Sequence, residues 1–154
     1  MARRVFFAFH YERDIWRASQ VRNSWVTKDR EAAGFWDAAS WEDVKRSGED
    51  AVKRWIDKQL EGTSVTVVLI GTETSERKYI KYEINKSWEK GNGLIGVYVH
   101  NLLDQNRRTD IKGVDPFIAL GYKSIKTYDW VNDNGYANLG DWIDAAFERA
   151  QSRQ

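Results

Sequence analysis

The stretch Val65-Thr-Val-Val-Leu-Ile70 decides the fold of this chain, because it is the longest apolar run in the sequence and only one threonine interrupts it. Its apolar residues are continuous and do not alternate with polar ones, which is typical of a strand covered on both faces of a parallel sheet. The run is far shorter than the roughly 20 apolar residues of a membrane helix. We therefore expect a buried central strand and no membrane association.

Similar runs lie on both sides of this stretch, at residues 5–9 and 94–99, and weaker candidates lie at 34–37 and 124–128. Apolar residues spaced three or four apart predict helices between these strands, in the segments 15–25, 44–60, 80–88 and 143–150. Ser40, with Asp43 three residues later, predicts the N-cap of the second helix. Because strands and helices alternate, the sequence predicts one α/β domain over residues 1–154: a flavodoxin-like three-layer sandwich with a five-stranded, mainly parallel sheet.

Two stretches outside these elements have a structural interpretation. Gly91-Asn92-Gly93 resembles a phosphate loop, but it precedes a strand, so we interpret it as a helix stop. The connection from 103 to 121 holds the only proline, Pro116, and either is functional or conceals a short helix.

Composition removes several classes of function. The 154 residues include no cysteine, which excludes disulfides, thiol catalysis and cysteine-bound metals, and the two histidines are too few for a histidine metal cage. A net charge of +1 argues against a DNA-binding protein, and no signal peptide is recognisable. We expect a cytoplasmic protein that holds no metal.

The charge is nevertheless uneven. Residues 1–30 carry seven Lys/Arg and three Asp/Glu (+4), whereas residues 129–154 carry two and five (−3). This asymmetry could favour a head-to-tail homo-oligomer, steer an anionic ligand, or simply reflect a solvated surface.

Aromatic and polar residues follow the expected strands, at the edge where open parallel sheets bind ligands. This edge holds Phe9, His10, Tyr11, Trp36, Asp37, Thr72, Thr74, His100, Tyr128 and Trp130. Together they predict a polar pocket in which aromatic rings can stack on a ligand. We interpret His10 as a pocket wall or loop anchor; the alternative is a role as acid or base, since imidazole titrates near neutrality. We interpret His100 as structural, whereas Trp25, Trp55, Trp88 and Trp142 fall on apolar helix faces and are expected in the core. No G-x-G-x-x-G, G-x-x-x-x-G-K-[ST] or G-x-S-x-G motif is present at the required place.

Glu83 is the sharpest candidate for chemistry. In Ser75-Glu-Arg-Lys-Tyr-Ile-Lys-Tyr-Glu-Ile84, Tyr79 and Glu83 are four apart and share a helix face beside the apolar positions Ile80 and Ile84. The carboxylate is therefore expected at the border of the buried face, within reach of a pocket. The alternative is an ordinary ion pair, with Lys86 or with an arginine of a neighbouring helix.

This order of elements, with S-x-x-x-[aromatic]-x-x-x-E opening the helix after the third strand, resembles a TIR domain. Five segments resemble its prokaryotic branch that includes ThsB, the TIR protein of Thoeris anti-phage systems: Phe7-Ala-Phe-His-Tyr-Glu-Arg-Asp14, Ser19-Gln-Val-Arg-Asn-Ser24, Thr66-Val-Val-Leu-Ile-Gly71, Arg77-Lys-Tyr-Ile-Lys-Tyr-Glu-Ile84 and Gly96-Val-Tyr-Val-His-Asn101. The chain departs from the wider TIR pattern in having Tyr79-Ile80 where Trp-Cys stands, and in lacking the proline of the loop after the second strand.

The resemblance implies an enzyme that cleaves the nicotinamide–ribose bond of NAD+, with Glu83 as its catalytic residue and NAD+ as substrate rather than cofactor. It also implies a cyclic ADP-ribose-type product that signals to a nucleotide-sensing effector protein. The expected substrate contacts are rings that stack on the nicotinamide or adenine, hydroxyls that bind ribose or phosphate, and groups near the diphosphate: Phe9, His10, Tyr11, Arg22, Asn23, Trp36, Asp37, Thr72, Thr74 and Tyr79.

Two other functions use the same fold. One is a non-catalytic interaction module in which Glu83 is merely paired. The other is a phosphoacceptor receiver domain, which the residues after the third strand, Gly71-Thr72, make unlikely because no phosphoacceptor aspartate stands there.

Overall fold

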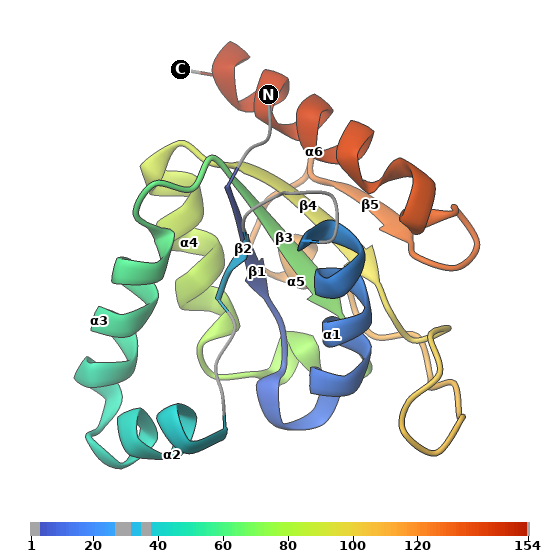
Figure 1. The fold of residues 1–154 in the computed structure, drawn as a ribbon. Helices are drawn as coiled ribbons and strands as arrows, with labels where there is room; N and C mark the ends of the chain where they lie inside the picture. The colour runs from blue at the N-terminus through green and yellow to red at the C-terminus, as the bar shows by residue number, and fades with distance from the viewer. Residues whose placement is uncertain (1–3, 27–31, 35–37, 154) are drawn as a thin grey trace.

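Five parallel strands form one sheet in the computed structural model, which describes residues 4–26, 32–34 and 38–153, with only the backbone of 38–41 (Figure 1). The strand order is β2-β1-β3-β4-β5. The strands are β1 (Val5–Ala8), β2 (Ala32–Ala33), β3 (Val65–Ile70), β4 (Gly93–Tyr98) and β5 (Lys126–Asp129). The predicted parallel sheet is confirmed, and the run that decides the fold is its central strand.

Both faces of the sheet are covered. Every residue of β1, β3 and β4 is buried, as continuous apolar runs require. Side chains alternate between two cores, so that Phe7 and Val67 face one side whereas Phe6 and Val68 face the other. The flavodoxin-like three-layer sandwich is therefore confirmed.

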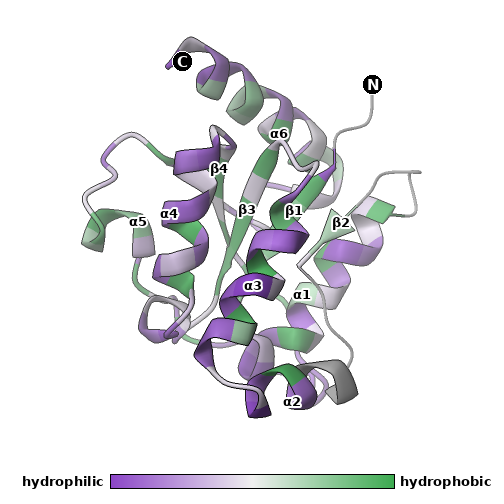
Figure 2. Cartoon of the chain, turned by 90° about the vertical axis from the view of Figure 1, so that its left-hand side faces the viewer, coloured by the Kyte–Doolittle hydropathy of each residue, from purple (hydrophilic) through white to green (hydrophobic). Residues whose placement is uncertain are grey.

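The helices divide between these two faces, as Figure 1 shows. α1 and α6 cover one face, and α3, α4 and α5 cover the other. In chain order the helices are α1 (Tyr11–Val26), α2 (Ala38–Arg46), α3 (Glu49–Leu60), the 3-10 turn η1 (Thr74–Glu76), α4 (Ile80–Lys90), α5 (Pro116–Ala119) and α6 (Gly135–Ser152). In Figure 2 the outward faces of α3 and α4 are largely hydrophilic and the strands behind them largely hydrophobic. In the described parts of the chain, no helix has the length and apolarity that a membrane crossing requires.

The prediction of one helix over 44–60 is wrong. The segment forms two helices, α2 and α3, because Gly48 has φ +97° and interrupts the helical hydrogen bonds. The predicted N-cap is also wrong: α2 begins at Ala38, which places Ser40 inside the helix.

The described part of the second strand lies just before its predicted position, and residues 35–37 of that prediction lie outside the described residues. β2 covers Ala32–Ala33 and is followed by Gly34, whose φ is +90°. A Cβ at Gly34 would lie 2.3 Å from the carbonyl oxygen of Phe7, so only glycine fits against β1 here.

The structure shows what the glycines at 91–93 and the long connection 103–121 do. Gly91 ends α4 in the left-handed conformation with φ +92°, and Gly93 begins β4, which confirms the helix stop. The long connection conceals the short helix α5, which Asp115 caps by accepting a 2.8 Å hydrogen bond from the backbone nitrogen of Phe117.

Candidate functional site

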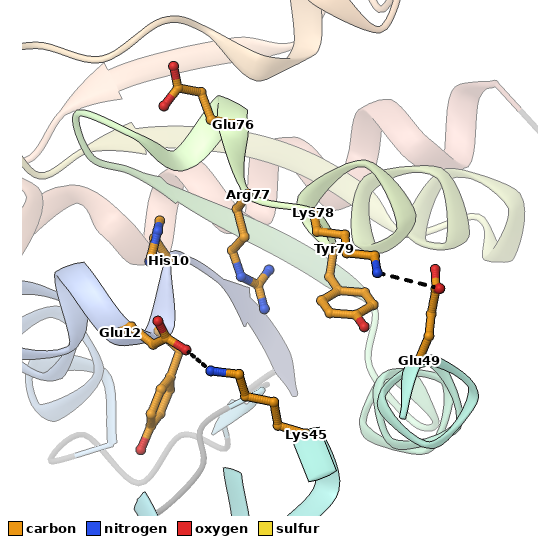
Figure 3. A pocket seen from close by; sticks show the side chains of 9 residues that line it. His10, Glu12, Lys45, Glu49, Glu76, Arg77, Lys78 and Tyr79 are labelled. Carbon is orange, nitrogen blue, oxygen red and sulfur yellow. Dashed lines mark hydrogen bonds and ion pairs between the residues drawn. The ribbon is translucent and has the colours of Figure 1, made fainter. Parts of the chain in front are cut away.

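The loops that follow β1 and β3 meet α2 and α3 around a cavity of about 520 Å³ at the carboxyl edge of the sheet (Figure 3). This is the predicted edge for ligand binding, and the volume suits a small-molecule site. The residues that line it are His10, Tyr11, Glu12, Lys45, Glu49, Glu76, Arg77, Lys78 and Tyr79.

Ion pairs between different elements shape this cavity. Lys45 of α2 lies 2.7 Å from Glu12 of α1, and Lys78 lies 3.4 Å from Glu49 of α3 (Figure 3). The hydrogen bond with Glu12 raises the pKa of Lys45, and Lys78 lowers the pKa of Glu49. Because each of these side chains is about half-exposed or more, their pairs are weak, and an anionic ligand can compete for the lysines.

Glu83 lies in the first turn of α4 and is only 3% exposed. Its backbone nitrogen donates a 2.9 Å hydrogen bond to the carbonyl oxygen of Tyr79, which begins the helix. Its carboxylate Oε1 accepts a hydrogen bond from Nη1 of Arg77, a residue that lines the cavity although Glu83 does not. The carboxylate thus lies one side chain behind the cavity wall.

Arg77 is the buried member of the cavity's cations. Its side chain is 10% exposed, and burial lowers its pKa to about 10, so it remains charged at neutral pH. The ion-pair alternative for Glu83 is therefore present in the structure. Its partner is Arg77 in the turn just before α4, and neither of the predicted partners: it is not an arginine of a neighbouring helix, and Lys86 lies 3.7 Å from Glu89 instead.

A buried polar network fixes the helix that holds Glu83. Ser87 donates a 2.7 Å hydrogen bond to the carbonyl oxygen of Glu83, and its hydroxyl lies 2.7 Å from that of Thr66 in β3. Asn92 donates to Thr66 and to Thr63 from the other side. The single threonine of the central strand thus positions α4 against the sheet.

Three predicted ligand-contact residues line the cavity: His10, Tyr11 and Tyr79. The Nδ1 of His10 accepts a 3.2 Å hydrogen bond from the backbone nitrogen of Arg13, so His10 is both a wall and a loop anchor. Phe9 is 3% exposed and belongs to the core beneath Tyr11, with ring centroids 6.1 Å apart.

The predicted hydroxyl contacts lie outside the cavity lining. Thr74 is fully buried and accepts a 2.7 Å hydrogen bond from the backbone nitrogen of Gly71, which holds the turn after β3. Thr72 donates instead to the carbonyl oxygen of Ile111.

Two further predicted contacts are not brought into the cavity, and two cannot be placed relative to it. Arg22 and Asn23 lie three turns along α1, about 16 Å from its start at Tyr11. Trp36 and Asp37 lie outside the described residues.

Sequence reasoning missed six lining residues: Glu12, Lys45, Glu49, Glu76, Arg77 and Lys78. The pair Arg77-Lys78, directly before a helix that carries the candidate carboxylate, was a usable signal. Lys45 and Glu49 face the cavity because the chain turns at Gly48, so the prediction of one continuous helix concealed them.

Two aromatic residues predicted at the ligand edge pack in the core, so that prediction is wrong for them. Tyr128 stacks on Trp142 with centroids 4.1 Å apart, and Trp130 is 7% exposed. Conversely, Trp88 was expected in the core but is 36% exposed, with the guanidinium of Arg153 3.8 Å above its ring. Trp25 is buried as predicted.

Comparisons with known proteins agree with this geometry. Residues 6–104 match the family model described as "Thoeris protein ThsB, TIR-like domain". The chain is also 46% identical over 138 residues to a Bacillus cereus (strain MSX-D12) protein named "Putative cyclic ADP-D-ribose synthase ThsB1". That alignment covers 84% of this chain and 72% of the relative.

Proposed function

Because the chain belongs to the Thoeris ThsB TIR-like family, we propose that it cleaves the nicotinamide–ribose bond of NAD+ and forms a cyclic ADP-ribose-type product. One observation carries the proposal: the long alignment with a relative whose name gives this activity. The structure supports it with a cavity at the carboxyl edge of the sheet and with Glu83 directly behind its wall.

The proposed reaction needs little acid catalysis, because the nicotinamide leaving group is already cationic. As the C1′–nitrogen bond breaks, the bonding electrons leave with nicotinamide and positive charge develops on the ribose. We assign Glu83 the role of stabilising this oxocarbenium-like centre with its negative charge. An adenine nitrogen or a ribose hydroxyl then bonds to C1′ and loses its proton where one is present, which closes the ring.

The lining residues support the binding of a dinucleotide. His10, Tyr11 and Tyr79 provide rings for stacking, and Lys45, Arg77 and Lys78 provide cations for the diphosphate. Rings that fold the substrate back on itself would exclude water and favour cyclisation over hydrolysis.

We further propose that residues 1–154 act as one TIR-like domain in the cytoplasm, since the five strands belong to one sheet and NAD+ is plentiful there. NAD+ is its substrate, and no other cofactor is invoked. The product is proposed to reach a nucleotide-sensing effector protein, and a homo-oligomer is proposed from the uneven charge of the two ends.

The first prediction concerns Glu83→Gln. This change keeps the shape of the side chain but removes its charge, so we expect nicotinamide release from NAD+ to fall by about 100-fold or more. Release and products are followed by mass spectrometry, with and without phage proteins. Glu89→Gln is the matched control, because Glu89 lies on the same helix and its side chain is 66% exposed.

Each outcome has a clear meaning. Equal conversion by the wild type and Glu83→Gln would remove Glu83 from the mechanism. If the wild type converts no NAD+ under any of these conditions, the non-catalytic interaction module is the better description.

A further inference from the structure

We propose that Arg77 inhibits Glu83 in the ligand-free protein, and that the diphosphate of the substrate releases the carboxylate by taking Arg77 as its own partner. The proposal rests on the proposed NAD+ cleavage and specifies how that site is controlled. Arg77 is a positioning residue in this scheme, and Glu83 is the residue that acts on ribose.

Arg77 lies between the cavity and the buried Glu83. The Arg77 side chain lines the cavity, whereas Glu83 is 3% exposed, does not line it, and is hydrogen-bonded to Arg77. Figure 3 shows the guanidinium of Arg77 directed into the space between His10 and Tyr79. A ribose in the cavity therefore meets Arg77 before it can meet the carboxylate.

The ion pair also neutralises the charge that the reaction needs. A carboxylate stabilises an oxocarbenium-like centre by its negative charge, and a guanidinium in contact with it cancels much of that field in a buried site. Glu83 is thus both shielded and electrostatically weakened while Arg77 holds it.

A diphosphate is the chemistry best suited to remove Arg77. Guanidinium groups bind phosphate oxygens with two parallel hydrogen bonds, which a single carboxylate oxygen does not match. Lys45 and Lys78 lie on the same cavity and add positive charge that attracts the diphosphate. Glu83 is the carboxylate that accepts the hydrogen bond of Arg77, so the exchange breaks this ion pair and forms another.

The backbone allows this exchange without refolding. The nitrogen of Arg77 donates a 3.1 Å hydrogen bond to the carbonyl oxygen of Thr74, and its own carbonyl oxygen accepts a 3.2 Å hydrogen bond from Ile80. Both sides of Arg77 are therefore held by η1 and α4, and rotation of the side chain alone changes its partner.

Two substrates with the same scissile bond test this proposal. NAD+ carries the diphosphate, whereas nicotinamide riboside lacks any phosphate. Arg77→Ala removes the guanidinium and opens the wall over Glu83. We expect the riboside to be cleaved about 10-fold faster by Arg77→Ala than by the wild type, and kcat/KM for NAD+ to fall by about 10-fold or more, since one charge-assisted contact is worth this much.

A second arm uses the wild-type protein alone. Inorganic pyrophosphate added with nicotinamide riboside should accelerate riboside cleavage, because it supplies the missing partner of Arg77. The same addition should have no accelerating effect on Arg77→Ala. Lys78→Ala is the matched control, because it removes a neighbouring cation that is not paired with Glu83: it should weaken NAD+ cleavage without raising riboside cleavage.

The failure of this proposal differs from the failure of the proposed function. If the wild type cleaves NAD+ but Arg77→Ala slows both substrates alike, or pyrophosphate leaves riboside cleavage unchanged, Arg77 does not inhibit Glu83. If the wild type cleaves no NAD+, NMR of the carboxyl carbon of Glu83 tests the exchange directly. A shift of this resonance when pyrophosphate is added to the wild type, and no such shift in Arg77→Ala, supports the exchange. A resonance that does not move in the wild type overturns it.

Discussion

At the scale of single residues, Thr66 connects the central strand to α4, the helix that carries Glu83. It is the one polar residue in the apolar run of β3, and its fully buried hydroxyl lies between Ser87 of α4 and Asn92. A buried hydroxyl that loses its partner incurs the full desolvation cost, so the network is sensitive to the removal of any member.

The second prediction follows from this network. Thr66→Val keeps the volume but leaves Ser87 and Asn92 with a missing partner, so we expect the free energy of unfolding to fall by about 1–3 kcal/mol. Urea unfolding measures it. Thr127→Val, at a half-buried position of β5, is the control and should cost less. Equal losses for the two variants would mean that the network adds nothing.

Residue-scale prediction from the sequence succeeded where local patterns determine the environment. The prediction that Glu83 lies away from open solvent followed from its place beside Ile80 and Ile84, and its burial agrees with it, although the carboxylate lies deeper than the predicted border. The hydrogen bonds of Thr74 and the core packing of Tyr128 depend on partners distant in the sequence or on turn geometry, which no spacing reveals.

At the scale of elements, the turn at Gly48 determines the shape of the cavity. Val44, Val52 and Ile56 face the same core although they belong to two helices, so the apolar pattern continues across the break. This continuity is why the sequence predicted a single helix. β1, β3 and β4 were predicted well because burial on both faces leaves a continuous apolar run, which few other environments produce.

The third prediction is that Gly48→Ala weakens both stability and substrate binding. Its φ of +97° strains any residue with a Cβ, so we expect a loss of about 1–2 kcal/mol on unfolding. Relaxation of that strain also moves Lys45 and Glu49, which should raise the KM for NAD+.

Gly121→Ala is a matched control for this effect. Gly121 has φ +87° and, like Gly48, open space where a Cβ would lie, but it is in the connection before β5, away from the cavity. It should lose similar stability and keep the wild-type KM. A raised KM in both variants would show that instability, rather than the turn at Gly48, affects binding.

At the scale of the whole molecule, a cluster of charges joins α1 to the long connection after β4. Arg13 lies 2.6 Å from Asp110, and the buried Arg17 donates 2.8 Å hydrogen bonds to the carbonyl oxygens of Leu102 and Arg108. Asp14 is 1% exposed, and its carboxylate oxygens have no hydrogen-bond partner among the described residues. Asp14 is thus buried without a hydrogen-bond partner among the described residues, whereas Asp110 of the same cluster is paired with Arg13.

The fourth prediction concerns pH. Burial raises the pKa of Asp14, so its charged form destabilises the fold, and this penalty disappears as pH falls through the raised pKa towards 3.8. Burial also acts to raise the pKa of Asp110, but hydrogen bonds from Arg13 and Ile111 outweigh it and lower that pKa to about 2. The stabilisation by Asp110 is therefore present above 3.8 and is lost as pH falls from 3.8 towards 2.

Urea unfolding at several pH values measures both effects. At pH 7, Asp14→Asn should raise the free energy of unfolding and Asp110→Asn should lower it, each by about 1–2 kcal/mol. The difference in unfolding free energy between each variant and the wild type should shrink in acid. For Asp14→Asn it should begin to shrink at a higher pH than for Asp110→Asn. Differences that stay constant across the pH range would show that neither carboxyl titrates differently on folding.

The placement of α6 has a consequence for synthesis of the chain. α6 packs on β4 so closely that a Cβ at Gly93 would lie 2.5 Å from the carbonyl oxygen of Ala146. The part of the sheet face that α6 covers, mainly over β4, therefore stays uncovered while the ribosome is still making residues 135–152, although α1 already lies on the same face. Its exposed apolar surface is what chaperones bind and what aggregates. The core on this face is thus completed only after α6 has left the ribosome, and a nascent chain short of α6 lacks part of the core that supports the cavity.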